Sequence, residues 1–119
     1  MNARIPALAA LMAMVATASF AQQPMTFRLA AAERNPMSCS QADASMSRPQ
    51  TVTIAQGVAL LTSNGGINDK ARLVSPGVYR TRWSSGGIAY DIEVNTTTSP
   101  ATLSVSEPKL GCKWSGKAF

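Results

Sequence analysis

The chain has 119 residues, and its eleven Lys and Arg against six Asp and Glu give a formal net charge of +5. It contains no histidine and two cysteines, which excludes Ser/His and Cys/His nucleophile pairs and argues against a zinc site. We therefore expect a protein that is not an enzyme and that has no catalytic residue, metal or cofactor.

Residues 1–21 read "MNARIPALAALMAMVATASFA", with one positive charge at Arg4, an apolar run, and small residues at Ser19 and Ala21. This order is typical of a secretory signal peptide that is cleaved after Ala21. The run is rich in Ala and shorter than the roughly 20 residues of a spanning helix, which argues against the alternative of a membrane anchor. We expect residues 22–119 to form one exported domain, periplasmic or extracellular, that does not span a membrane.

Removing that segment takes Arg4 with it and leaves ten basic against six acidic side chains, a net charge of +4. The basic residues are spread along the chain, without the run that marks a nucleic-acid-binding arm. We expect a monomer whose partner is a protein or an anionic envelope polymer, and no nucleic-acid partner. The alternative is a charged surface that only keeps the protein soluble.

The first predicted strand lies within residues 25–31, where the apolar residues Met25, Phe27 and Leu29 alternate with the polar residues Thr26 and Arg28. Residues 35–50 show no strand period and contain two bounding prolines. This segment is either a short helix over residues 40–47 or a loop that carries Cys39. Short alternating runs broken by Gly, Pro, Asn and Ser follow, which is typical of an all-β domain.

The stretch "TVTIAQGVALLT", residues 51–62, predicts two strands joined by a tight turn. A three-residue loop with Gly57 in the left-handed conformation would pair Ile54 with Val58 and Val52 with Leu60. All four of these apolar side chains would then share one face.

Four further strands are predicted if "SSGG", "NTTTSP" and "EPKL" are their connections. Two rows of side chains and one further pair then lie on the core face. The first row is Tyr79, Ile92, Leu103 and Trp114. The second row is Thr81, Tyr90, Val105 and Cys112, and the pair is Trp83 beside Ile88. A slip of one residue would reverse the faces, so the alternation specifies which side chains point inward.

The opposite face of these strands carries polar and charged rows. They are Arg80, Asp91, Ser104 and Lys113 in one row, and Val78, Glu93, Thr102 and Ser115 in the other. Arg80 would face Asp91, a pairing worth about 0.2–1 kcal/mol. The carboxylates of Asp91 and Glu93 would therefore lie on an open, solvated surface beside Arg80, as part of a salt pair and not as the two acids of a glycosidase.

The two cysteines predict a disulfide between Cys39 and Cys112, because exported proteins fold where such bonds persist. A domain of this size has a marginal core, and the bond would contribute about 4 kcal/mol in the chain-entropy model. The fold class is then all-β: a small antiparallel barrel or a two-layer sandwich, a meander of six to seven short strands with one disulfide.

The leading functional hypothesis is a non-catalytic exported binding module that uses its outer sheet face and loops. Its candidate contacts are Arg80, Arg82 and Lys113, with "SSGG" as an adaptable loop. The alternative is a carrier of a small apolar ligand with an aromatic interior. That interior would be lined by Phe27, Tyr79, Trp83, Tyr90 and Trp114.

The stretch "SSGGIAY", residues 84–90, resembles the loop motif Ser-x-Ser-Gly-x-x-Tyr of periplasmic inhibitors of c-type lysozyme. Ser84, Gly87 and Tyr90 stand at the matching positions, while Gly86 replaces the second serine of the motif. The resemblance covers these seven residues. It implies a small exported β-barrel with a disulfide, and a loop that enters the acidic cleft of an enzyme.

Overall fold

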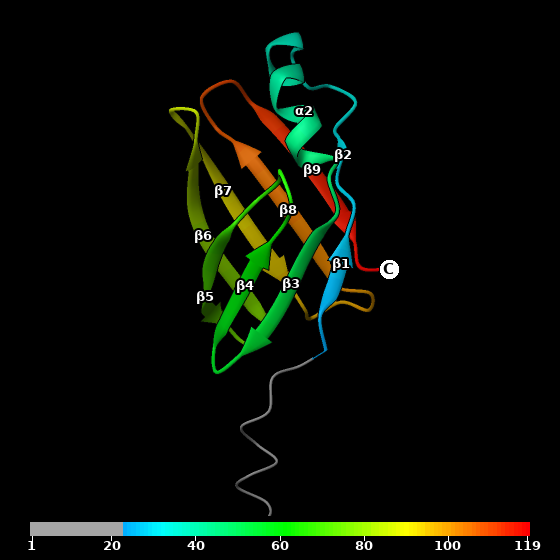
Figure 1. Ribbon diagram of the computed structural model, residues 1–119, viewed down its shortest axis with the longest axis vertical. Coiled ribbons are helices and arrows are strands. Elements are labelled where there is room, and N and C mark those ends of the chain that lie inside the picture. Colours follow the sequence, from blue (N-terminus) through cyan, green and yellow to red (C-terminus); the bar gives the residue numbers. More distant parts are fainter. Residues whose placement is uncertain (1–22) are drawn as a thin grey trace, which may run out of the picture.

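The computed structural model describes residues 23–119, so the predicted signal peptide over residues 1–21 lies outside the described residues. The described chain forms one antiparallel sheet of nine strands that curls into a half-barrel, with a short helix, α2, at one end (Figure 1). The apolar core fills the inside of the curl.

Seven strands run as a meander in which each strand pairs with the next, which confirms the predicted connectivity. They are β3 (Gln50–Ala55), β4 (Val58–Thr62), β5 (Asp69–Ser75), β6 (Val78–Ser85), β7 (Ile88–Asn95), β8 (Thr102–Glu107) and β9 (Cys112–Lys117). The described sheet has nine strands where six to seven were predicted, and the single strand predicted within residues 25–31 is present as two short ones. These are β1 (Met25–Phe27) and β2 (Ala30–Ala31).

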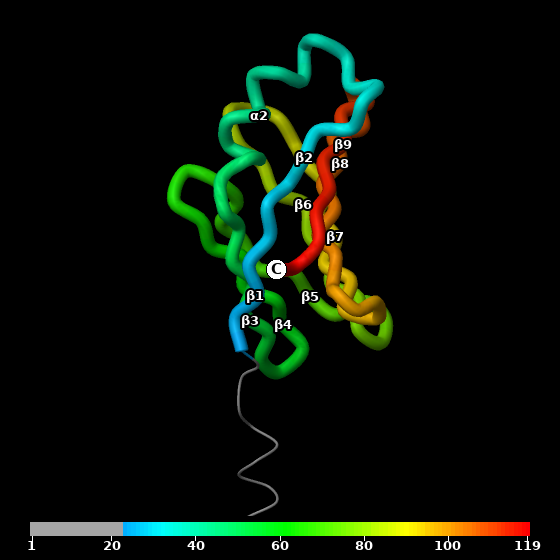
Figure 2. Tube along the Cα trace, turned by 90° about the vertical axis from the view of Figure 1, so that its right-hand side faces the viewer, coloured from blue at the N-terminus to red at the C-terminus, as the bar shows by residue number. Residues whose placement is uncertain are grey.

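The segment that contains β1 and β2 joins the two edges of the meander. β1 pairs with β3 and β2 pairs with β9, so this segment runs between the first and last strands (Figure 2). Phe27 and Leu29 are buried, as the alternation predicted. A side chain at Gly116 would collide with the carbonyl oxygen of Arg28, so the close approach of this segment to β9 requires glycine there. Strand edges that would otherwise expose unpaired backbone groups are thereby covered.

The predicted pairing of β3 and β4 is wrong by one residue. Ala55 pairs with Val58 across a two-residue turn, in which Gln56 has a φ of 54° and Gly57 a φ of 77°. Two positive φ angles are typical of a type I′ turn, whose twist matches that of the strands. The core side chains of β4 are consequently Ala59 and Leu61, and Leu60 is exposed.

The predicted faces of β6 to β9 are correct, but each predicted pairing is displaced by two residues. Tyr79 pairs with Val94 instead of Ile92, and Trp83 pairs with Tyr90 instead of Ile88. Val105 pairs with Ile92 and Trp114 in place of the predicted partners. A displacement of two residues returns each side chain to the same face, so the core was identified although the partners were not.

The turns explain the displacement. The β6–β7 connection is the two-residue turn Gly86–Gly87, with φ angles of 60° and 79°, and not the four residues "SSGG". Likewise Glu107 pairs with Cys112 at the end of β8, so it is not part of the predicted "EPKL" connection. On the outward face, Arg80 opposes Glu93 and Arg82 opposes Asp91, which corrects the predicted pair of Arg80 with Asp91.

Of the two alternatives for residues 35–50, the structure shows the short helix, and the predicted disulfide is present. A 3-10 turn, η1 (Met37–Cys39), leads into α2 (Ser40–Met46), and Cys39 is bonded to Cys112 with a Cα–Cα distance of 5.8 Å. Gln50 is fully buried below the helix. Its amide donates to the carbonyl oxygens of Ser45, Met46 and Arg48. Its Oε1 accepts from the backbone N–H of Ile67 at 3.0 Å, so one side chain connects α2 to the β4–β5 loop.

Candidate functional site

A hollow of about 700 Å³ lies on the outward face of β6 to β9, and three of the predicted contact residues line it. Arg80 and Arg82 come from β6, and Lys113 comes from β9. Between them the sheet carries small side chains, because alternate residues of β8 and β9 are serines. These are Ser104, Ser106 and Ser115. Long charged side chains around short ones give the outer face its concave shape. We call this region the outer hollow.

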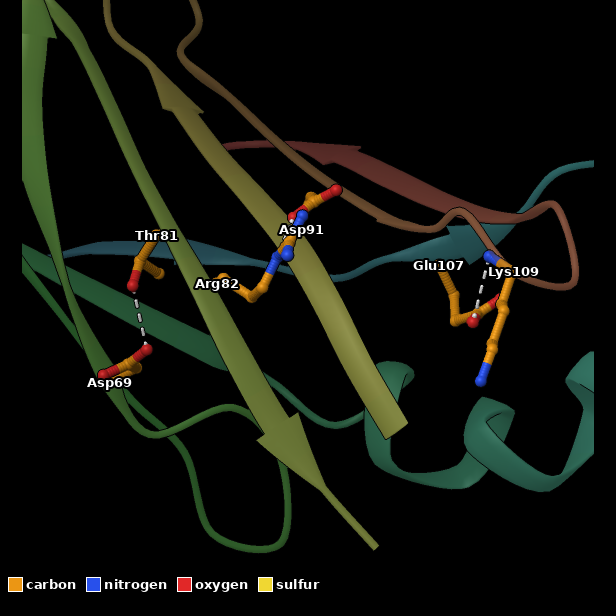
Figure 3. Close-up of polar contacts among 6 residues, drawn as sticks. All are labelled: Asp69, Thr81, Arg82, Asp91, Glu107 and Lys109. Carbon is orange, nitrogen blue, oxygen red and sulfur yellow. Dashed lines mark hydrogen bonds and ion pairs between the residues drawn. The ribbon is translucent and has the colours of Figure 1, made fainter. Parts of the chain in front are cut away.

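Both arginines of the outer hollow are held by carboxylates on the neighbouring strand. Arg80 Nη2 lies 2.8 Å from Glu93 Oε1, and Arg82 Nε donates to Asp91 Oδ1 at 2.9 Å (Figure 3). The side chains of the two arginines remain 63% and 69% exposed. Exposed pairs of this kind contribute about 0–1 kcal/mol to stability. Their main effect is therefore to orient the guanidinium groups.

Lys113 differs from the two arginines because it forms no ion pair with any other residue of the described range 23–119. Its backbone is fixed from the opposite side. The side chain of Asn35 donates to Lys113 O at 2.8 Å and accepts from Lys113 N at 2.9 Å. The side chain of Lys113 therefore starts from a fixed point of β9 and brings a positive charge, without an ion-pair partner in the described part of the chain, to the outer hollow.

A second cavity, of about 210 Å³, lies at the end of the half-barrel where α2 sits. We call it the end cavity; its walls come from α2, the β6–β7 turn and the β8–β9 loop. Trp83, Tyr90 and Trp114 line it together with the disulfide. The ring centroids of Trp83 and Tyr90 are 5.5 Å apart, and those of Tyr90 and Trp114 are 6.1 Å apart. Burial raises the pKa of Tyr90, and the negative charge of Glu107 raises it further.

Glu107 is the residue of this region that the sequence pattern missed. It is 4% exposed and lines the end cavity. Its Oε1 accepts from the backbone N–H of Lys109 at 3.2 Å, and its Oε2 accepts from that of Leu110 at 2.5 Å (Figure 3). A carboxylate just before a Pro-containing turn is well placed to accept such N–H groups, a signal that was available in "EPKL".

The structure divides the predicted contact residues among three places. Arg80, Arg82 and Lys113 share the outer hollow. Ser84 and Gly87 are exposed at the end of the β6–β7 hairpin, whereas Tyr90 is 5% exposed and belongs to the end cavity. The seven residues of "SSGGIAY" therefore present their glycine turn outward and their tyrosine inward.

Comparisons of the chain with known protein families, with curated proteins and with solved structures give no match. Within residues 23–119, the structure contains no helix that is both long and apolar enough to cross a membrane. The same part of the chain brings together no group of three or more Cys, Asp or Glu side chains that could hold a metal ion.

Proposed function

We propose that this chain is a non-catalytic, exported binding module, and that the outer hollow contacts a protein or an anionic envelope polymer. The observation that supports it is the convergence of Arg80, Arg82 and Lys113 on one concave surface. Three cations around a floor of small hydroxyl side chains form a surface that is complementary to several anionic groups.

The geometry of the arginines favours recognition over internal stabilisation. Arg80 uses Nε and Nη2 on a single oxygen of Glu93, and Arg82 uses Nε on Asp91. Most N–H donors of each guanidinium group remain free for carboxylate or phosphate oxygens of a partner. Because the two carboxylates already hold the arginines in place, a partner loses less side-chain entropy on binding.

A narrower form of this proposal is an inhibitor similar to the periplasmic lysozyme inhibitors. The exposed Gly86–Gly87 turn supports it, since such a turn could enter a cleft. Tyr90 would then have a supporting role, because its ring packs against Trp83 on the paired strand of the same hairpin.

The alternative of a small-ligand carrier has weaker support. Phe27, Tyr79, Tyr90 and Trp114 are buried in the core, where they pack against other side chains. The end cavity measures about 210 Å³, below the about 300 to 1,000 Å³ of typical small-molecule sites. Packing in the core therefore accounts for these aromatic residues without an apolar ligand.

The test is affinity capture by the oxidised protein from envelope and medium fractions, at low and high salt. A triple variant with Arg80→Ala, Arg82→Ala and Lys113→Ala is compared with a control that loses the same charge elsewhere. The control carries Arg34→Ala, Arg48→Ala and Lys109→Ala, all at exposed positions. A partner that the wild type and the control retain, and that the first variant loses, supports the outer hollow.

Two other outcomes would count against this proposal. Equal losses of binding in both variants would mean that net charge alone is responsible for the binding. Capture of no partner at all would contradict the hypothesis of a binding module. Inhibition assays with lysozymes in the same series test the narrower form. An inhibitor should act on at least one lysozyme class and should lose potency when Gly86 and Gly87 are replaced.

A further inference from the structure

The end cavity combines a buried carboxylate with aromatic walls. Glu107 is 4% exposed, and among residues 23–119 it forms no ion pair. Two backbone N–H groups are its hydrogen-bond donors. A buried charge that is only partly compensated carries a large desolvation cost, which a cation inside the cavity would offset.

Among residues 23–119, no basic side chain forms an ion pair with Glu107. The nearest basic side chain along the chain is Lys109, and Figure 3 shows it extending past the Glu107 carboxylate toward α2. Asp43, on α2, accepts a hydrogen bond from Trp114 Nε1 at 2.8 Å. Asp43 thus adds a second negative charge next to Trp114. Burial is the main cause of the raised pKa of Tyr90, and the negative charge of Glu107 adds to it.

The aromatic side chains attract the same kind of ligand. The faces of Trp and Tyr rings bind ammonium groups, most strongly where water is excluded. Trp83, Tyr90, Trp114 and Glu107 all line the cavity. Trp83 is half-buried, whereas Tyr90 and Trp114 are 5% and 2% exposed, so Trp83 presents the most accessible ring. The cavity measures about 210 Å³, below the about 300 to 1,000 Å³ of typical small-molecule sites, so the ligand must be as small as a single alkylammonium group. Trp83 is half-buried and Leu110 and Gly86 are exposed, so the rim of the cavity opens to solvent.

We propose that the end cavity is a binding site for a small alkylammonium cation, with Glu107 as its counter-charge and Trp83, Tyr90 and Trp114 as its aromatic walls. The site does not use Arg80, Arg82 or Lys113 of the outer hollow, and Trp114 is the one proposed wall residue that lines both. Its ligand is a primary or quaternary ammonium group, whether free in solution or carried by a lipid headgroup.

Tryptophan fluorescence of the oxidised protein measures this binding directly, because Trp83 and Trp114 line the cavity. The probes are choline chloride and butylammonium chloride, with sodium chloride matched for ionic strength and 3,3-dimethylbutan-1-ol as a neutral analogue of choline. We expect a saturable change with at least one cation and none with the alcohol. Equal responses to choline and the alcohol would overturn the proposal, as would a response that sodium chloride reproduces.

Two variants assign the site. Glu107→Gln keeps an oxygen acceptor for the turn and removes the charge, and it should weaken cation binding about tenfold. The matched control is Glu33→Gln, which removes one exposed carboxylate outside both the outer hollow and the end cavity and should leave cation binding unchanged. If both variants weaken binding equally, the effect is one of overall charge and the assignment to the end cavity is wrong.

Should Glu107→Gln fail to fold, as judged by circular dichroism, Trp83→Leu tests the aromatic wall while Trp114 remains as the fluorophore. Trp83 is only half-buried, so this variant should fold and should weaken cation binding several-fold. Unchanged binding would contradict the site. Vesicles of phosphatidylcholine distinguish the two sources of the ligand: sedimentation with vesicles that Glu107→Gln abolishes identifies a headgroup, and binding of free choline alone identifies a soluble cation.

Discussion

The outer hollow and the end cavity use the same four strands but place charge in opposite environments. Outside, Arg80 and Arg82 are exposed and each is paired with a carboxylate on β7. Inside, Glu107 is buried among aromatic rings and is held only by backbone N–H groups. Because successive side chains of a strand point to opposite faces, the exposed arginines keep their hydration, whereas the carboxylate of Glu107 loses most of its own.

The two regions should therefore differ in how much stability they carry. The end cavity is tied to the disulfide, to α2 and to Gln50, all of which connect distant segments. The outer hollow is built on side chains that extend into solvent. Substitutions at the end of the half-barrel should affect folding, and substitutions on the outer face should affect mainly binding.

The largest expected effect is the loss of the disulfide. Cys39 and Cys112 are separated by 73 positions, so Cys39→Ala with Cys112→Ala should lower the free energy of unfolding by about 4 kcal/mol. Urea denaturation followed by circular dichroism measures it. The control on the outer face, Arg80→Ala with Arg82→Ala, should lose about 1 kcal/mol or less. Similar losses of unfolding free energy in the two variants would contradict the view that the end of the half-barrel carries more stability than the outer face.

The next effect comes from Gln50, whose amide bonds fix α2 over the core. Gln50→Ala leaves three carbonyl oxygens and the N–H of Ile67 without their partner, and should cost about 3 kcal/mol. Gln41→Ala, at an exposed position of the same helix, should change stability by about 0.5 kcal/mol or less. Thermal unfolding measures both. A small effect at residue 50 would mean that α2 contributes little to the end of the half-barrel.

Tyr90 makes the end cavity sensitive to alkali. Its folded pKa is raised above the ordinary value of 10.0, so the unfolded state loses the phenol proton first. The stability from this group is complete below about pH 10 and is lost as the pH rises through the folded pKa. Tyr90→Phe should therefore lose stability less steeply than the wild type above pH 10 in urea titrations at several pH values. Parallel curves would indicate that the phenol is not desolvated.

The smallest expected effect is the coupling energy of an ion pair on the outer face, which tests the register of β6 and β7. A double-mutant cycle between Arg82 and Asp91 should give a coupling of about 0.2–1 kcal/mol, because these two side chains form an ion pair. The cycle between Arg80 and Asp91 should give a smaller value, since Arg80 pairs with Glu93. The reverse order would support the pairing that the sequence pattern predicted and would contradict the observed one.

The faces of the strands could be read from the sequence because the period of two is a local property. Tyr79, Leu103 and Val105 point inward as predicted, and Arg80 and Lys113 point outward. The partners of these residues depend on where each turn begins. Gln56 adopts a positive φ that few residues other than glycine adopt, so the two-residue turn after β3 had no clear sequence signal.

The sequence by itself determined the all-β class, the meander, the disulfide and the inward-facing residues, because these follow from alternation and from the presence of two cysteines. Only the tertiary structure decided that one segment joins both edges of the curled sheet. It also gathered Arg80, Arg82 and Lys113 around one hollow, and placed Glu107 among aromatic rings. Such arrangements depend on pairing register and on the curvature of the sheet, which are set by contacts between residues far apart in the chain.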